Sequence, residues 1–400
     1  MKDELKDIEF NPPRSAYVHI PFCRRRCFYC DFPISVVGDQ RDGSNSGAIA
    51  LYITKLCDEI QLTTSLGNSL QTIFFGGGTP SLLTVAQLSQ VLEALDRQFG
   101  IPKEAEISME IDPGTFDFEQ IQGYKSAGVN RFSLGVQAFQ SQLLSACGRT
   151  HTVEDVYTSI DLIRRAGIEN FSLDLISGLP HQAIADWQQS LEKAIALTPK
   201  HISTYDLTIE PQTPFGKQLK PGEKPLPSDE LTAEMYRLAQ KCLTEAGYEH
   251  YEISNYAKPG YQCQHNRVYW ENRSFYGFGM GATSYVNSDR ASRPRKTREY
   301  YDWIDQLKNP TNTPVSNSLQ DYLLDTLMVG LRLAEGVDLT TLTQQFGQPL
   351  IDQVLKCLRP YEKVEWIVIS DDRIRLTDPE GFLFSNVILV KLFETFETEN

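Results

Sequence analysis

Six short apolar runs recur along the first half of the chain, and helix-like stretches separate them. The runs cover residues 16–20, 71–75, 106–111, 131–136, 171–176 and 201–207. Parallel β-strands need crossover connections of a dozen or more residues, usually helices, and gaps of this length can hold them. The pattern therefore predicts six βα units.

Three of the gaps show the clearest helical pattern, with apolar residues three and four positions apart, at residues 81–99, 153–167 and 183–197. Six βα units predict an α/β fold, either a doubly wound sheet or an incomplete (β/α)6 TIM-like barrel. Both folds collect functional groups at the carboxyl ends of their strands. Residues that carry chemistry should therefore follow the apolar runs.

The repeat ends near residue 212. Residues 213–228 are rich in proline and glycine and read as an extended loop, which leads into a predicted helix over 229–246. From Asp321 onward two or three helices precede an alternating stretch over 364–376, with a plausible hairpin turn at residues 370–372. Helices followed by a hairpin predict a C-terminal helical, winged-helix-like module.

Composition and charge exclude several classes of protein. A net charge of −14 argues against a general nucleic-acid binder, because phosphate contacts need a basic surface. The longest apolar runs fall short of the roughly 20 residues of a membrane span. Eight scattered cysteines without a secretory signal fit a reduced cytoplasmic chain better than a disulfide scaffold.

Three cysteines, Cys23, Cys27 and Cys30, directly follow the first apolar run. Thiolates at this spacing can bind three corners of a 4Fe-4S cluster and leave the fourth iron without a protein ligand. A structural zinc site is the alternative, but it normally has four ligands, and no second Cys/His pair lies nearby in the sequence. A disulfide is the other alternative. The cysteine triplet predicts an iron–sulfur cluster with an open iron.

Other chemically loaded residues follow the next runs. Residues 76–80, Gly-Gly-Gly-Thr-Pro, follow the second run, Glu110 and Asp112 close the third, and Gln137 and Asp174 come at the fourth and fifth. Glycines let a backbone approach a ligand closely, although a tight turn explains a lone glycine run equally well. Together these positions predict one binding site at the carboxyl edge of the strands.

Several motifs recur in one order along the chain: Tyr17–Phe22 with the cysteine triplet, Gly76–Pro80, Ser108–Pro113, Arg131–Phe139, Gly148–His151 and Asp174–Pro180. In this order they resemble the radical S-adenosylmethionine (SAM) proteins of the oxygen-independent coproporphyrinogen III oxidase family, across nearly the whole chain. The resemblance implies a barrel of the radical SAM type. It also implies a 4Fe-4S cluster on the three cysteines, whose free iron binds SAM.

The resemblance further implies a set of SAM-binding residues. Tyr17 would lie beside the cluster and SAM. Gly77, Gly78 and Thr79 would contact the methionyl part. The remaining polar groups of SAM would be held by Glu110, Gln137, Arg149 and Asp174. The residue types suit these roles, because arginine pairs with carboxylates and acidic side chains accept from ammonium or hydroxyl groups.

Two features separate this chain from the oxidases themselves. Phe32 stands where the oxidase motif has a fourth cysteine, and only about 15 residues precede the first apolar run. The segment Cys263–Trp270 contains a His-Asn-x-x-Tyr-Trp element that is similar to that of the HemW haem chaperones. This similarity implies that His265 is a ligand of haem iron, with Cys263 as a second candidate.

These observations predict a haem chaperone that binds haem and transfers it to an acceptor protein, with a 4Fe-4S cluster and exchangeable SAM. The alternative is the oxidase reaction, a radical SAM decarboxylation of coproporphyrinogen III to protoporphyrinogen IX. The predicted domains are an N-terminal tail (1–15), the core barrel (16–212), a linker and haem-motif region (213–310) and the C-terminal domain (311–400). We expect a cytoplasmic protein, for which peripheral membrane contact and a homodimer stay open.

Overall fold

A nine-stranded sheet forms the body of the protein in the computed structural model, which describes residues 10–307, 318–370 and 372–397. The strand order is β11-β1-β4-β5-β6-β7-β8-β10-β9. Its six central strands are β1 (Ser15–Ile20), β4 (Thr72–Gly77), β5 (Glu106–Ile111), β6 (Arg131–Gln137), β7 (Phe171–Ser177) and β8 (His201–Asp206). They are parallel to one another and correspond to the six predicted runs, so the predicted α/β fold is confirmed.

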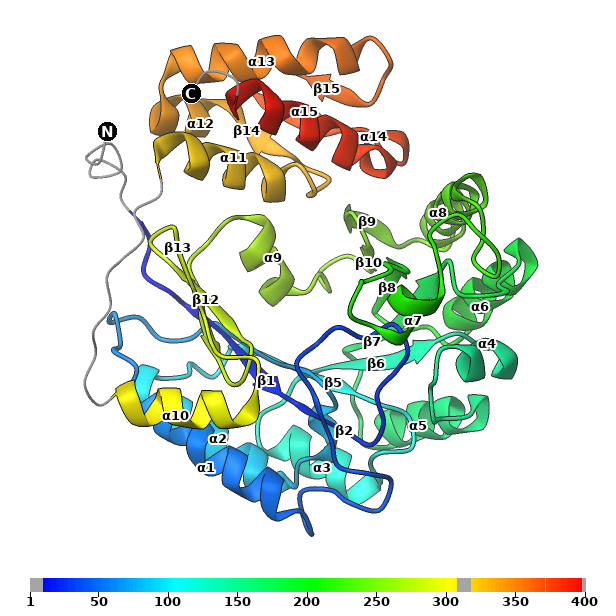
Figure 1. Cartoon of the computed structure of the whole chain (residues 1–400), viewed down its shortest axis with the longest axis vertical. Coiled ribbons are helices and arrows are strands. Elements are labelled where there is room, and N and C mark those ends of the chain that lie inside the picture. The colour runs from blue at the N-terminus through cyan, green and yellow to red at the C-terminus, as the bar shows by residue number, and fades with distance from the viewer. Residues whose placement is uncertain (1–9, 308–317, 371, 398–400) are drawn as a thin grey trace.

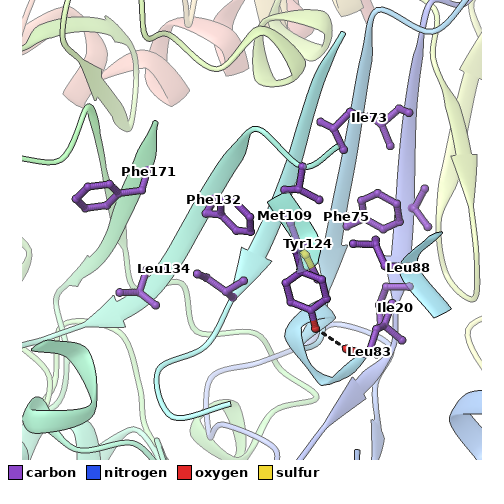
Figure 2. Close-up of a cluster of buried hydrophobic side chains, with 14 of the residues drawn as sticks. Ile20, Ile73, Phe75, Leu83, Leu88, Met109, Tyr124, Phe132, Leu134 and Phe171 are labelled. Atoms are coloured by element: carbon purple, nitrogen blue, oxygen red, sulfur yellow. Dashed lines mark hydrogen bonds between the residues drawn. The ribbon is translucent and has the colours of Figure 1, made fainter. Parts of the chain in front are cut away.

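The strands alternate between two environments. On the outer face their apolar side chains, including Phe75, Met109 and Phe132, are buried in the main hydrophobic core (Figure 2). Tyr124 belongs to this core and donates its hydroxyl to the backbone oxygen of Leu83. Burying this apolar face stabilises the sheet, and each large side chain contributes about 1.5–3 kcal/mol.

Helices cover the outer face of the sheet (Figure 1). Those between the central strands are α1 (Gly47–Leu62), α2 (Val85–Phe99), α3 (Phe118–Ser126), α4 (Ser141–Ala146), α5 (Val153–Arg165) and α6 (Ile184–Ala196). Both α2 and α5 begin with a capping box, in which Thr84 and Thr152 accept the backbone N–H three residues on. The predicted helices over 81–99, 153–167 and 183–197 therefore exist, with slightly shorter bounds.

Residues beyond 212 extend the sheet at both edges, which the sequence pattern did not predict. β11 (Tyr276–Phe278) pairs in parallel with β1. At the other edge, β10 (Asn255–Ala257) pairs antiparallel with β8 and with β9 (Glu249–Glu252). Between these strands lie α7 (Pro214–Gln218), α8 (Asp229–Glu245) and α9 (Gln264–Trp270). The predicted linker and haem-motif region, 213–310, thus contributes three strands to the same sheet.

Three shorter segments complete this part of the chain. β2 (Phe22–Cys23) and β3 (Ser35–Val36) pair in parallel and bring the two ends of the cysteine loop together. β12 (Thr283–Val286) and β13 (Asp289–Ser292) form a hairpin, and α10 (Thr297–Leu307) follows it. α10 packs beside α1 on the outer face (Figure 1).

The C-terminal module has its own hydrophobic core. Its helices are α11 (Leu319–Gly330), α12 (Leu339–Phe346), α13 (Gln348–Glu362), α14 (Glu380–Leu383) and α15 (Ser385–Glu397). A small antiparallel sheet joins β14 (Val337–Asp338), β15 (Ile367–Ile369) and β16 (Arg373–Leu376). Helices followed by a β15–β16 hairpin are what the sequence predicted, although Asp371 of the predicted turn lies outside the described residues.

Polar contacts tie this module to the sheet domain. Arg237 of α8 forms a two-pronged ion pair with Glu380, with nitrogen–oxygen distances of 2.6 and 2.9 Å. His250 of β9 lies 2.9 Å from an oxygen of Asp378. Figure 1 shows α9 beneath the module, on the side of the sheet that faces away from the covering helices. The inner face of the sheet is therefore the face toward which α9 lies.

Candidate functional site

A cavity of about 900 Å³ occupies the inner face of the sheet. The three cysteines and all eight predicted SAM residues line it. These residues come from β1, the cysteine loop, four further strands and the loop after α4, so only the fold brings them together. His265, the twelfth predicted site residue, is not among the lining residues.

The alternation along β6 shows how the sequence builds the cavity wall. Phe132, Leu134 and Val136 are buried in the outer core. The alternate positions line the cavity, namely Arg131, Ser133, Gly135 and Gln137. Successive side chains on a strand point to opposite faces, so one strand serves both the core and the site.

The cysteine loop lies over the carboxyl ends of the strands. The Thr79 hydroxyl lies 3.7 Å from the sulfur of Cys23, and a guanidinium nitrogen of Arg149 lies 3.6 Å from the sulfur of Cys27. Arg26 donates to the backbone oxygens of Cys30, Phe32 and Ile34, which fixes the far end of the loop. Two of the three thiols therefore have a polar donor beside them.

Gly78 lies so close to the cysteine loop that a side chain at this position would not fit. A Cβ atom at Gly78 would lie 3.0 Å from the Cys23 sulfur and 2.7 Å from the Phe22 backbone oxygen. Burial raises the pKa of the Cys23 thiol to about 12, and it also raises the pKa of Cys30. Such thiols lose their protons to solvent readily only when a cation binds the thiolate, and a cluster iron would supply that cation.

The donor set fits a cluster better than a single ion. Among the residues that the structure describes, no three His, Cys, Asp or Glu side chains converge on a point where one metal ion could bind. In a 4Fe-4S cube each thiolate binds a different iron, so its ligands stand apart. Three thiols around a cavity, with a polar donor beside two of them, therefore fit the cluster that the sequence predicts.

Arg149 already has a partner in this structure. One of its nitrogens lies 2.6 Å from a carboxylate oxygen of Asp112 and 3.0 Å from the backbone oxygen of Gly135. Asp112 also accepts from the Thr79 hydroxyl at 3.3 Å. Arginine has five donors, so Arg149 can hold Asp112 and still donate to a ligand carboxylate. Sequence reasoning named Asp112 at a strand end but missed its role in orienting Arg149.

Glu110 lies deep in the cavity wall. Its carboxylate accepts the backbone N–H of Gly77 at 3.0 Å. Burial raises the pKa of Glu110 to about 8, and the negative charge of Asp174 adds to the rise. Such a carboxyl takes up or releases a proton near neutral pH, and a cationic ligand group beside it would favour the charged form.

Asp174 is buried among three hydroxyl donors. Ser133, Ser172 and Ser203 donate to its carboxylate at 2.7–3.2 Å. Burial raises the pKa of Asp174, and these hydrogen bonds oppose that rise. The three serines fix its orientation toward the cavity, and no single-sequence pattern identified them as its partners.

Two further wall residues have unusual local environments. Gln137 has φ of 66° at a β-bulge between β6 and β7, which aims its side chain differently from that of a regular strand residue. His19 bonds the Tyr17 hydroxyl and the Pro33 backbone oxygen, each at 3.0 Å. Its ring fills the space where a Cβ atom of Gly77 would lie. His19 therefore packs Gly77 and Tyr17 into place.

His265 lies outside the cavity and is fully buried on α9. Its Nδ1 lies 2.8 Å from the Thr72 hydroxyl and its Nε2 lies 2.9 Å from the Tyr269 hydroxyl. Burial lowers the pKa of His265 to about 3, so its ring is neutral. Both nitrogens have partners, so ligation of iron requires the ring to leave this position. Cys263 is equally buried and lies 3.6 Å from Glu106.

Two family models match this chain. The Radical SAM superfamily matches residues 17–194, which contain all eleven predicted cluster and SAM residues. The HemN C-terminal domain matches residues 317–384, within the C-terminal module. Within the described part of the chain, no helix has the length and hydropathy needed to cross a membrane.

Individual relatives extend the likeness to the whole chain. The structure of the coproporphyrinogen III oxidase HemN from Escherichia coli superposes with a TM-score of 0.80, at 23% identity, over 95% of this chain and 90% of that one, which shows the fold. The heme chaperone HemW of Bacillus subtilis is 33% identical, over 94% of this chain and 98% of its own length. The HemW of Synechocystis sp. is 47% identical, over 97% and 98%. The chain therefore belongs to the HemW heme chaperone family of radical SAM proteins.

Proposed function

We propose that this protein binds haem and delivers it to an acceptor protein. The observation that carries the proposal is the identity of 47% to a heme chaperone over nearly the full length of both chains. A cavity of about 900 Å³ is within the usual range for a bound organic ligand and its neighbours. The acceptor would be a haem-free protein that meets this chain directly.

We further propose that the cluster and SAM share the cysteine end of the cavity. Cys23, Cys27 and Cys30 would hold the cluster, which would supply an open iron and an electron source. Arg149 would orient the carboxylate of SAM, since its guanidinium lies between Asp112 and the Cys27 sulfur. Glu110 would accept from a donor group of SAM, and its proton would leave as the cationic ligand arrives.

For His265 as the haem ligand, the proposal includes a conformational change. The ring would have to exchange the Thr72 and Tyr269 hydroxyls for iron. Its neutral state already suits coordination, because iron binds the unprotonated nitrogen. Movement of α9 would part the ring from Thr72 of β4, and release from Tyr269, which is on the same helix, would need a change of side-chain rotamer.

The test is an anaerobic haem titration of the cluster-loaded protein, followed through the Soret absorption band. We expect saturable haem binding by the native chain, and a weaker, shifted band for His265→Ala. Thr72→Val is the matched control, since it removes one partner of the ring and leaves the imidazole. An unchanged spectrum for His265→Ala would remove this residue from the proposal, and absence of haem binding by the native chain would overturn the proposal itself.

The oxidase reaction is tested in the same preparation. Coproporphyrinogen III and SAM are added under reducing conditions, and protoporphyrinogen is assayed. Phe32, which replaces the fourth motif cysteine, is 58% exposed at the cavity rim, so no thiol is available there. We expect no turnover, and formation of protoporphyrinogen would favour the oxidase over the chaperone.

Location and assembly complete the proposal. The eight cysteines are all free thiols, which agrees with a reducing compartment, so we propose that the protein works in the cytoplasm. Any membrane contact would be peripheral. A homodimer stays a prediction, and sedimentation of the cluster-loaded protein with and without haem tests it.

A further inference from the structure

Arg131 is a buried cation on the inner wall of the cavity. It is the first residue of β6, and its side chain is on the face that also carries Ser133 and Gly135. The residue is only 2% exposed, and yet it lines the cavity. No role follows for it from the predicted cluster and SAM residues.

The guanidinium of Arg131 has no hydrogen-bond or ion-pair partner among the residues that the structure describes. Its Nε is buried without a hydrogen bond, and no carboxylate of the described residues lies within ion-pair distance of its nitrogens. Arg149 and Arg293, the other arginines buried to a similar degree, pair with Asp112 and Glu59 at 2.6 and 2.8 Å. An unpaired buried charge is costly, so such a group normally has a partner.

The two carboxylates that act on the charge of Arg131 are already engaged. Glu106 accepts the backbone N–H groups of Gln264 and His265 at 3.1 and 3.0 Å, and it thereby caps α9. Asp174 accepts from the three serines around it. Both carboxylates raise the pKa of Arg131, against the effect of its burial, so it keeps its charge. Neither carboxylate forms a contact ion pair with it.

We propose that Arg131 receives a carboxylate of the bound ligand, and that this carboxylate is a propionate of haem. The inference rests on the proposed haem function. Arginine recognises carboxylates with two parallel hydrogen bonds, and haem carries two propionates. A ligand carboxylate at this position supplies the missing partner of the buried guanidinium.

The position of Arg131 favours a propionate over the carboxylate of SAM. Arg131 begins β6 and Gln137 ends it. Six residue steps along a strand cover about 20 Å, so Arg131 lies toward the opposite end of the wall from Gln137, and of the predicted SAM residues only Asp174 acts on its charge. The carboxylate of SAM must stay near the cysteines, where Arg149 is available. Arg131 is thus a second carboxylate site in the same cavity.

The experiment compares haem with its dimethyl ester, whose propionates carry no charge, on the full cluster-loaded chain. Arg131→Met removes the guanidinium with little change in volume, and Arg131→Lys keeps the charge without the two-pronged geometry. Arg97→Met, on the exposed side of α2, is the matched control. Affinities come from Soret titrations, and SAM binding is measured separately by calorimetry.

We expect Arg131→Met to bind haem about 10- to 100-fold more weakly, the range that a charged hydrogen bond supplies. Arg131→Lys should lose less, and Arg97→Met nothing. The ester should bind the native chain and Arg131→Met equally weakly. Without ligand, Arg131→Met should unfold at the same temperature as the native chain or higher, because its buried charge is gone.

Each failure has its own signature. If the native chain binds no haem, the proposed function is wrong. If it binds haem, and Arg131→Met or Arg131→Lys binds it equally well, the inference is wrong and the function stands. If Arg131→Met loses SAM affinity but keeps haem affinity, the carboxylate belongs to SAM and the propionate site is wrong. If neither variant folds, Arg131 is structural, and the inference is wrong.

Discussion

Two groups of buried polar residues differ in how many of their donors and acceptors are hydrogen-bonded. One group surrounds Glu59 next to β1, and the other surrounds Arg131 on the cavity side of β6. Behind β1, Glu59 is fully buried and accepts from Arg293, Tyr300 and the backbone of Gly279 at 2.6–2.8 Å. In front of β6, Arg131 is equally buried and has no ion-pair partner among the described residues. A buried arginine is thus paired within the protein beside Glu59, and a buried arginine on β6 is left available to a ligand.

The difference separates stability from binding. The Glu59 cluster joins α1, α10 and the turn after β11, and Tyr52 connects it to the His19 backbone at 2.7 Å. A filled network of this kind fixes the position of the strands but has no capacity left for a ligand. Donors without a protein partner, on a wall whose position is fixed in this way, remain available to bind a ligand. Substitutions in the two groups should therefore have opposite consequences.

The largest effect should come from a substitution in the ligand cavity. Cys27→Ala removes one of three thiols that have no protein alternative, so iron and sulfide bound after anaerobic reconstitution should fall to background. Its thermal unfolding without cluster should be unchanged. Cys242→Ala, on α8 and away from the cavity, is the control and should load fully. Normal iron and sulfide content in Cys27→Ala would contradict the distinction between residues that bind a ligand and residues that stabilise the fold.

The next largest effect should come from a substitution in the Glu59 cluster. Arg293→Met leaves the buried Glu59 carboxyl without its guanidinium partner, which should lower the free energy of unfolding by about 3–5 kcal/mol. Denaturant titration of the cluster-free chain measures it. Arg97→Met, at an exposed position, is the matched control. A loss below that of the control would mean that the Glu59 cluster does not hold this edge of the sheet.

Glu110 gives a pH-dependent test within the cavity. Its pKa in the folded chain, about 8, is above its ordinary value of 4.5, so the folded state holds the proton more tightly. Stability is therefore lost as pH rises through this window, by up to about 3 kcal/mol between pH 5 and pH 7. Glu110→Gln has no such proton.

The measurement is the unfolding free energy of the native chain and of Glu110→Gln, both free of ligand, from pH 5 to pH 8. We expect the native chain to lose stability relative to the variant as pH rises. Below the ordinary pKa of 4.5 the carboxyl is protonated in both the folded and the unfolded chain, so the difference should become constant when the titration is extended below that pH. A difference independent of pH over the whole range would show that Glu110 is not buried as described.

The smallest effect should come from an exposed pair. Arg237 and Glu380 join α8 to the C-terminal module, but their side chains are 44% and 39% exposed. Exposed ion pairs contribute about 1 kcal/mol or less, so Arg237→Met should change the unfolding free energy within that limit and less in high salt. A loss as large as that of Arg293→Met would show that pairing, and not burial, decides the difference.

Much of this arrangement could be predicted from the sequence. The six strands follow from the six short apolar runs and from the length of the gaps between them. The cysteine triplet and the strand-end residues needed only their order along the chain, because parallel strands bring their carboxyl ends to one edge. The short strand β11 was missed, since three residues next to glycines carry too little pattern.

The availability of each side chain could not be predicted. His265 is in a motif that suggested a ligand, but Thr72, almost 200 residues earlier, accepts or donates at its Nδ1 and closes it. Arg131 is in a motif without a noted role, and it is open. Which residue has a free hydrogen-bonding group depends on neighbours from other strands, and one sequence without its fold does not reveal them.

The most direct test of the account is a calorimetric titration of SAM into the anaerobic, cluster-loaded chain, repeated with the chain in which Cys23, Cys27 and Cys30 are all alanine. If the cavity is one joint site for cluster and SAM, the native chain binds SAM saturably at one site and the triple variant binds it at least tenfold more weakly. Equal affinity in both chains would contradict the joint site.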